Sequence, residues 1–280
     1  MSKTWFITGA SSGLGYQMTE QVLARGNRVI GAVRRPDALV DLQRQYGNRL
    51  AVATLDLIDT SSIRAAVDHA FQSASRIDVI VSNAGYGLVG AAEEVTDGQI
   101  DRQIATNLTG SIQLIRAVLP HLRRQGGGRI VQVSSEGGQI AYPNFSLYHA
   151  TKWGIEGFIE AVAQEVASFG IDFIIAEPGP TATNFGAGLV HADPMTAYDD
   201  TPAGEVRRAV SSGSFVLKGD AGRTAAAMIA AADEAKPALR LALGSTAYNS
   251  ISQALSQRLA AIQAQRAVAF SADRDLQRTL

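Results

Sequence analysis

Three side chains between residues 134 and 152 are of the types that carbonyl chemistry requires: Ser135, Tyr148 and Lys152. Tyr148 and Lys152 are four residues apart, so on one helix they share a face. Ser135 follows an apolar strand pattern at 129–133, which would end beside that face. A nearby ammonium favours the phenolate and lowers a tyrosine pKa from its usual value of about 10. Tyr148 could then donate a proton to a ketone oxygen while Ser135 donates a hydrogen bond, and tyrosinate could deprotonate an alcohol in the reverse direction. Because a Tyr and a Lys four residues apart also occur by chance, the pair alone does not establish a site. The elements around it must show whether Tyr148 and Lys152 are functional.

A glycine-rich turn lies near the N-terminus, between a strand pattern at 5–7 and a helical pattern that reaches Ala24. Its glycines are spaced G-x-x-x-G-x-G, and no Lys-Ser/Thr pair follows them, which excludes a P-loop. Glycines let the backbone approach a pyrophosphate, and a helix N-terminus offers free N–H groups. A flexible glycine loop is the alternative, but the flanking strand and helix favour a dinucleotide-binding turn. The residues expected to bind the cofactor here are Gly9, Ser11, Ser12, Gly13, Leu14 and Gly15.

The end of the second predicted strand, 28–33, distinguishes the two nicotinamide cofactors. An acidic residue there would bind the ribose 2′-hydroxyl, whereas a basic residue accommodates a 2′-phosphate. The chain has Arg34 and Arg35 and no acid at this point. Guanidinium pairs well with phosphate, so we expect NADP(H) bound through Arg34. The alternative is that Arg34 only covers a solvent-facing edge.

The next two predicted strands, 50–55 and 77–81, also end in candidate cofactor residues. Asp56, followed by Leu57, could accept a hydrogen bond from an adenine amino group or could cap the helix that begins near residue 60. The small residues after the fourth strand would let a flat adenosine lie over the carboxyl edge of a sheet. They are Asn83, Ala84 and Gly85.

A long helical pattern at 97–124 contains Asn107 and Gly110 near its middle, where both are unfavourable. This local break predicts a kink, and a kink would free a backbone carbonyl to bind water. An exposed helical Asn107 is the alternative.

Composition bounds the class of protein. The chain has 280 residues, 46% hydrophobic and 18% charged, with a formal net charge of -1. These values fit one globular α/β domain spanning 1–280 and give no basic field for nucleic acid or membrane binding. Without cysteine there is no disulfide or thiolate site, and the four histidines lack metal-ligand spacing, so we expect no metal and interpret all four as ordinary histidines. We found no signal peptide or membrane-spanning run and expect a cytoplasmic protein.

Further strand patterns at 171–176 and 239–243 bring the total to seven, which predicts a doubly wound parallel sheet of the Rossmann type with helices on both faces. The segment 184–214 predicts a long substrate loop in which Phe185, Met195 and Tyr198 would face the substrate. The segment 245–280 predicts a helical C-terminal extension.

In combination these motifs resemble the classical short-chain dehydrogenases/reductases, over about residues 3–245 and with the usual distance from Ser135 to Tyr148. The resemblance implies that Tyr148 is the acid/base, that Lys152 lowers its pKa and holds the nicotinamide ribose, and that Ser135 orients the substrate oxygen. It implies a proton-relay water on Asn107, and it supports Arg34 as a 2′-phosphate ligand. The residues implied to cover the nicotinamide run from Pro178 to Thr183 and include Gly179 and Thr181.

The function expected is that of an NADPH-dependent carbonyl reductase or alcohol dehydrogenase, on a small and lipophilic ketone, aldehyde or secondary alcohol. The resemblance also implies a homodimer or homotetramer. A non-catalytic NADP(H)-binding sensor or scaffold of the same fold is the alternative, although such proteins usually lack part of the catalytic set. A sugar epimerase or dehydratase is disfavoured by the glycine spacing and the chain length.

Overall fold

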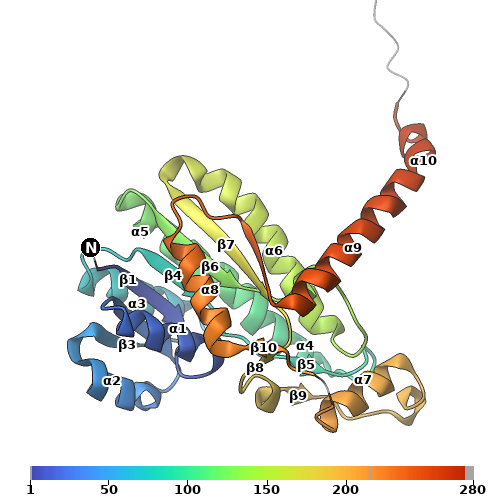
Figure 1. Cartoon of the computed structure of the whole chain (residues 1–280), viewed down its shortest axis with the longest axis horizontal. Coiled ribbons are helices and arrows are strands. Elements are labelled where there is room, and N and C mark those ends of the chain that lie inside the picture. Colours follow the sequence, from blue (N-terminus) through green and yellow to red (C-terminus); the bar gives the residue numbers. More distant parts are fainter. Residues whose placement is uncertain (1, 215, 275–280) are drawn as a thin grey trace, which may run out of the picture.

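The computed structural model describes residues 2–214 and 216–274, and its centre is a parallel sheet (Figure 1). The strand order β11-β7-β6-β4-β1-β2-β3 confirms the predicted seven-stranded, doubly wound sheet. Its strands are β1 (Thr4–Thr8), β2 (Arg28–Val33), β3 (Leu50–Thr54), β4 (Val79–Ser82), β6 (Gly128–Val133), β7 (Ile171–Pro178) and β11 (Arg240–Leu243).

Helices cover both faces because alternate residues of each strand point to opposite sides. Phe6 packs in one apolar layer, whereas Trp5 and Ile7 pack in the other. The first layer contains side chains from α3 (Thr60–Ser73), α5 (Gly110–Arg124) and α6 (Ser146–Val166). The second contains side chains from α1 (Gly13–Ala24), α2 (Val40–Tyr46) and α8 (Ala221–Asp233). The strands are therefore buried on both faces, as in other all-parallel sheets.

The strand order reverses between β1 and β4, which lie next to each other although β2 and β3 separate them in the chain. Open parallel sheets bind ligands at such a switch point, beside the carboxyl ends of the strands. The glycine turn after β1 and the segment 83–85 after β4 both lie at this point.

The helix predicted at 97–124 contains the predicted irregularity. It comprises α4 (Asp97–Ile104), a π-helical turn η3 (Ala105–Thr109) and α5. A π turn inserts one residue into the helical repeat and so displaces its backbone bonds. The chain accommodates Asn107 within this π turn.

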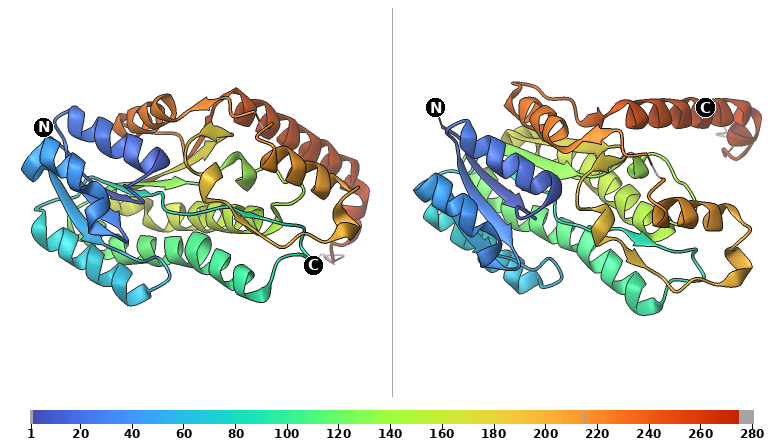
Figure 2. Two further views of the ribbon diagram at one scale, coloured as in Figure 1. Left: turned by 90° about the horizontal axis from the view of Figure 1, so that it is seen from below. Right: turned by 60° about the horizontal axis from the view of Figure 1, so that its bottom comes forward.

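The predicted substrate loop differs in detail from its expected structure. The segment 184–214 is not a plain loop, because it contains the helix α7 (Pro202–Ser211), with Thr201 as its N-cap and Pro202 in its first turn. The C-terminal extension forms α9 (Ser245–Ala264) and α10 (Arg266–Ser271), which project from the body (Figures 1 and 2); residues 275–280 of the predicted extension lie outside the described residues. Among the described helices, none has the length and apolar character needed to cross a bilayer.

Candidate functional site

Ser135, Tyr148 and Lys152 lie together at the carboxyl edge of the sheet. Ser135 is the second residue after the end of β6, and Tyr148 and Lys152 occupy successive turns of α6. All three are buried, with exposed fractions of 8%, 8% and 7%. The Lys152 Nζ donates to the Val133 carbonyl at 3.0 Å and lies 5.5 Å from the centre of the Tyr148 ring. The predicted constellation is therefore assembled by β6 and α6.

The charges in this constellation are governed by burial. Burial raises the pKa of Tyr148 to about 12, with Ser135 opposing the rise and Glu136 and Glu156 adding to it. Burial lowers the pKa of Lys152 to about 8, which the carboxylate of Glu156 opposes. The Tyr148 pKa shifts upward, which is opposite to the direction expected from the sequence. The loss of hydration on burial outweighs the effect of the nearby ammonium. Tyr148 is a neutral phenol at pH 7 and can act as a proton donor.

Asn107 is 3% exposed, so the alternative of an exposed helical side chain is wrong. Its side chain makes two bonds to the backbone of Tyr86: Oδ1 accepts from the Tyr86 N–H at 3.1 Å, and Nδ2 donates to the Tyr86 carbonyl at 2.7 Å. Its own carbonyl accepts from the Ser111 hydroxyl at 3.1 Å. Asn107 therefore joins the π turn to the segment after β4.

The glycine turn has the close contacts that its composition predicts. Gly9 and Gly13 have φ of 65° and 53°, a conformation that glycine adopts without strain. A Cβ on Gly15 would lie 2.2 Å from the Gly9 carbonyl, and one on Gly9 would lie 2.9 Å from Asn83 Nδ2. The Asn83 side chain donates to the Thr8 carbonyl at 2.9 Å, which ties β4 to the turn. Glycine is thus required at the switch point because β1, α1 and the segment after β4 approach one another closely there.

The start of α1 faces a cavity of about 340 Å³. The cavity is lined on one side by residues 11–13, 16 and 17, and on the other by residues 182–184 and 221. The N-cap residue Ser12 makes no side-chain capping bond, so the first-turn N–H groups of α1 are not capped by it. Free N–H groups and the positive end of a helix suit an anion, and the cavity therefore fits a nucleotide phosphate.

The predicted nucleotide residues at the other strand ends fall at the same edge. Arg34 follows β2 and is exposed, and it forms no ion pair with any described residue. The alternative role of Asp56 as a helix cap is wrong, because Asp59 caps α3 by accepting from the N–H groups of Ser61 and Ser62. Asp56 instead accepts from the Ile58 N–H at 3.2 Å, and Leu57 is buried.

The residues after β7 lie across this edge from the glycine turn. Pro178 ends β7, and the Gly179 N–H donates to the Leu243 carbonyl of β11 at 3.0 Å. The Thr181 hydroxyl bonds the Gly179 carbonyl at 2.8 Å, while Thr183 lines the cavity beside Gly13.

Of the three side chains expected to face the substrate, Phe185 has its ring centre 6.0 Å from that of Tyr148. Tyr198 is instead directed to Glu93, with a hydrogen bond of 2.8 Å. Met195 bonds Glu94 through its backbone N–H, and its side chain is exposed. Only Phe185 is thereby placed beside the constellation.

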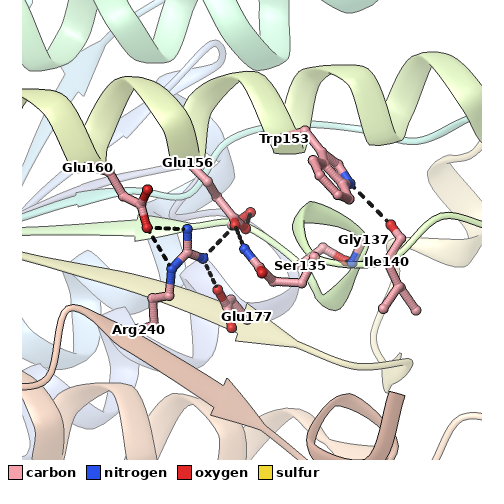
Figure 3. A network of polar contacts seen from close by, with 10 residues as sticks. Ser135, Gly137, Ile140, Trp153, Glu156, Glu160, Glu177 and Arg240 are labelled. Atoms are coloured by element: carbon pink, nitrogen blue, oxygen red, sulfur yellow. Dashed lines mark hydrogen bonds and ion pairs between the residues drawn. The ribbon is translucent and has the colours of Figure 1, made fainter. Parts of the chain in front are cut away.

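Several buried polar residues close to the constellation were missed in the sequence. His149, interpreted there as an ordinary histidine, is 4% exposed and bonds the loop that carries Ser135. Glu156 and Arg240 form an ion pair behind Lys152, with Glu160 and Glu177 joining it (Figure 3). The spacing of His149 and Glu156 on α6, seven residues, was the available signal, since it places both on one helix face.

Comparison with known proteins agrees with this geometry. Residues 3–193 match the family model described as short chain dehydrogenase. The chain is 37% identical over 249 residues to Oxidoreductase BOA17 from Botryotinia fuckeliana, covering 87% of this chain and 89% of that protein. The protein therefore belongs to the short-chain dehydrogenase/reductase family of oxidoreductases, whose members use a nicotinamide cofactor.

Three further proteins are similar to this chain in sequence or in fold. A crystal structure of a short-chain dehydrogenase from Streptomyces avermitilis superposes with a TM-score of 0.90 at 38% identity, covering 97% of this chain and 98% of that one. A 3-ketodihydrosphingosine reductase from Bacteroides thetaiotaomicron is 34% identical over 179 residues, 64% of each chain. A structure from Burkholderia cenocepacia, in complex with NADP, shares the fold at 23% identity, with a TM-score of 0.74 and coverage of 94% of this chain and 97% of that one.

Proposed function

We propose that the protein is an NADPH-dependent reductase of lipophilic ketones or aldehydes, able to oxidise the corresponding secondary alcohols. The observation that carries this proposal is that Ser135, Tyr148 and Lys152 are buried together at the same carboxyl edge of the sheet as the glycine turn. A cofactor whose phosphates bind at that turn can extend along the carboxyl edge of the sheet toward Tyr148. When bound, the cofactor supplies the hydride.

The protein's own groups would then manage the charge that forms on the substrate oxygen. Ser135 donates a hydrogen bond to that oxygen, and Tyr148 transfers its phenolic proton to it. The ammonium of Lys152 stabilises the tyrosinate that remains. Burial of all three excludes water, so that each interaction is stronger than it would be in solution.

The walls beside Tyr148 support a lipophilic substrate. Val89, Phe145 and Tyr148 form a buried apolar cluster. Four partly buried residues pack against it from the neighbouring loops and from α7: Tyr142, Leu189, Val206 and Val210. An apolar wall of this kind binds a hydrocarbon group next to the carbonyl. The Bacteroides relative, named as a 3-ketodihydrosphingosine reductase, also supports a ketone substrate.

Tyr148→Phe tests the chemistry. Without the phenolic proton we expect reductase activity to fall by about 10²-fold or more, while NADPH binding is retained. NADPH consumption against a panel of ketones, aldehydes and steroids measures the loss, and Tyr46→Phe on α2 is the matched control. Activity near that of the wild type would remove Tyr148 from the mechanism. NADPH binding without turnover of any panel member by the wild type would favour the non-catalytic alternative.

Arg34→Ala tests the choice of cofactor. Arg34 directly follows β2 and is exposed, so its guanidinium is available to a 2′-phosphate. We expect the variant to lose about 10-fold or more in affinity for NADPH and little for NADH, as loss of one charge-assisted bond implies. Arg44→Ala, which removes an exposed ion pair with Asp41, is the control. Equal losses for the two cofactors would show that Arg34 does not recognise the 2′-phosphate.

We also propose a cytosolic location, a homodimer or homotetramer as the assembly, and a single domain over 1–280. The absence of cysteine supports the location, and the length of the chain supports a single domain. The exposed apolar residues of α9 support the assembly. Cell fractionation tests the location, and cooperative single-transition unfolding tests the single domain.

A further inference from the structure

The loop at 134–142 connects β6 to the segment before α6 and carries Ser135. Within the loop, the Ser135 Oγ accepts a hydrogen bond from the Gly137 N–H at 3.0 Å. The position of the serine hydroxyl is therefore set by the backbone of the loop. Three side chains on one face of α6 bond this loop: His149, Trp153 and Glu156, which we call the anchor residues.

His149 makes two bonds to the loop. Its Nδ1 lies 2.8 Å from the Gly137 carbonyl, and its Nε2 accepts from the Tyr142 N–H at 3.3 Å. A carbonyl can only accept and an amide N–H can only donate, so Nδ1 must carry the hydrogen and Nε2 must be bare. The geometry requires the neutral Nδ1–H tautomer.

The other two anchor residues bond the loop before and after Gly137, as Figure 3 shows in part. The Trp153 indole N–H donates to the Ile140 carbonyl at 3.2 Å. The Glu156 carboxylate accepts from the Ser134 hydroxyl and from the Gln139 amide, each at 2.5 Å. The loop is thus bonded to α6 at five of its residues, Ser134, Gly137, Gln139, Ile140 and Tyr142.

The two glycines of the loop permit this contact. A Cβ on Gly137 would lie 2.7 Å from His149 Nδ1, and a Cβ on Gly138 would lie 1.8 Å from Glu156 Oε1. A side chain at either position would therefore displace the loop or the anchor side chain that contacts it. The glycine pair and the anchor residues therefore form one structural unit.

We propose that His149 is a positioning residue, which acts through the 134–142 loop to hold the Ser135 hydroxyl beside Tyr148. The inference rests on the proposed function, since it assigns Ser135 to the substrate oxygen. Tyr148 and Lys152 use one face of α6 for chemistry, and the anchor residues use an adjacent face to place the third member of the set.

The surroundings of His149 keep its ring neutral. Tyr142 and Tyr148 present uncharged rings with centres at 4.5 and 6.0 Å, and Phe145 contacts the ring as well. Glu136, on the same loop, directs its carboxylate to the Ser250 hydroxyl of α9 at 2.8 Å. Burial lowers the pKa of His149 below its ordinary value of 6.5. A proton on His149 Nε2 would point at the Tyr142 N–H, which needs an acceptor there. The hydrogen bond from the Tyr142 N–H to Nε2 is therefore lost as the pH falls through the lowered pKa of His149.

A double-mutant cycle with Ser135 tests the positioning role. His149→Asn should lower kcat about 10- to 100-fold, leave the KM for NADPH unchanged and abolish the acid limb of the kcat–pH profile below pH 6.5. In a Ser135→Ala background the same change should alter kcat by no more than about threefold, because it acts through the missing hydroxyl. His121→Asn, on α5 and bonded to Asp68, is the matched control. An undiminished effect in the Ser135→Ala background would overturn the proposal.

The tautomer and protonation state of the His149 imidazole can be measured independently of turnover. Nitrogen-15 NMR of the wild-type imidazoles, assigned by the signal missing in His149→Asn, should show the neutral Nδ1–H tautomer at pH 7. The Gly137 and Tyr142 amide hydrogens should exchange faster in the variant, and His149→Gln serves if His149→Asn does not fold. An Nε2–H tautomer, an imidazolium or unchanged exchange would overturn the proposal, even if wild-type turnover failed and with it the proposed function.

Discussion

At the scale of single residues, the protein places the ammonium of Lys152 beside the phenol of Tyr148, and burial is the main cause of the pKa shift of each group. The pKa of Tyr148 rises to about 12, whereas that of Lys152 falls to about 8. A protonated phenol is the form required for reduction, and the charged lysine is the form that stabilises the tyrosinate produced. Both forms coexist below pH 8, which is the combination that the proposed reduction requires at neutral pH.

The proposed role of Lys152 predicts that the rate of reduction depends on pH. As the pH rises through about 8, Lys152 loses its charge, and we expect kcat for ketone reduction to fall. Tyr148 remains protonated in this range, since its pKa is about 12. Lys152→Arg should remove the basic limb because arginine does not titrate there, and Lys152→Met should be slow at every pH. A basic limb that persists in Lys152→Arg would contradict this assignment.

At the scale of elements, one arginine joins α6, β7 and β11 behind the site. Arg240 of β11 bonds Glu156 and Glu160 of α6 and Glu177 of β7 (Figure 3). Two of these carboxylates are nearly inaccessible, with side-chain exposures of 2% for Glu156 and 3% for Glu177. Burial and the neighbouring Glu156 raise the pKa of Glu177 to about 7 despite the arginine. The cluster thus fixes the helix of the site to the sheet.

Removing the arginine would leave three carboxylates without their counter-ion. Arg240→Met should lower the free energy of unfolding by about 3 kcal/mol, the low end for broken buried pairs because the Arg240 side chain is 31% exposed. A carboxyl with a raised folded-state pKa contributes stability at low pH and loses it as the pH rises through that pKa. The deficit should therefore be larger at pH 8 than at pH 5, as urea unfolding would measure. Arg44→Met, whose partner Asp41 is exposed, should cost less than about 1 kcal/mol; equal costs would contradict a buried network.

At the scale of the whole molecule, the C-terminal helices project from the body (Figure 2). Their apolar side chains include several that are exposed. Leu255, Leu259 and Ile262 fall on one face of α9 and are 49%, 57% and 69% exposed. Arg258 is the one charged residue in α9, and its guanidinium lies 4.9 Å from the centre of the Trp153 ring on α6. A helix face without charge can pack on a copy of itself without like-charge repulsion, which favours a second copy of this chain as its partner.

Light scattering of the purified protein tests this assembly. The wild type should have the mass of a dimer or tetramer, and Leu255→Glu combined with Ile262→Glu should reduce that mass, because both charges would be buried at the interface. Val40→Glu, a change at an exposed apolar residue of α2, should leave the mass unaltered. A monomeric wild type, or an unaltered mass in the double variant, would rule out α9 as the contact.

The amino-acid sequence predicted the strands of the sheet, the glycine turn and the placement of Tyr148 and Lys152 on one helix. These features depend on local rules: short apolar runs that end in turn residues, positive φ at glycine, and the spacing of four between Tyr148 and Lys152. The same rules located the irregularity at Asn107, which the structure forms as a π turn.

The direction of the pKa shift of Tyr148 and the bonding partners of His149 and Arg240 follow from the tertiary structure and not from local sequence patterns. Arg240 and Glu156 are far apart in the chain, and the parallel pairing of β11 with β7 brings them together. The direction of the Tyr148 pKa shift likewise depends on how completely the ring is buried, which no local pattern specifies. Desolvation and long-range pairing depend on three-dimensional proximity, and that is the physical reason why these properties could not be predicted from residue type and spacing.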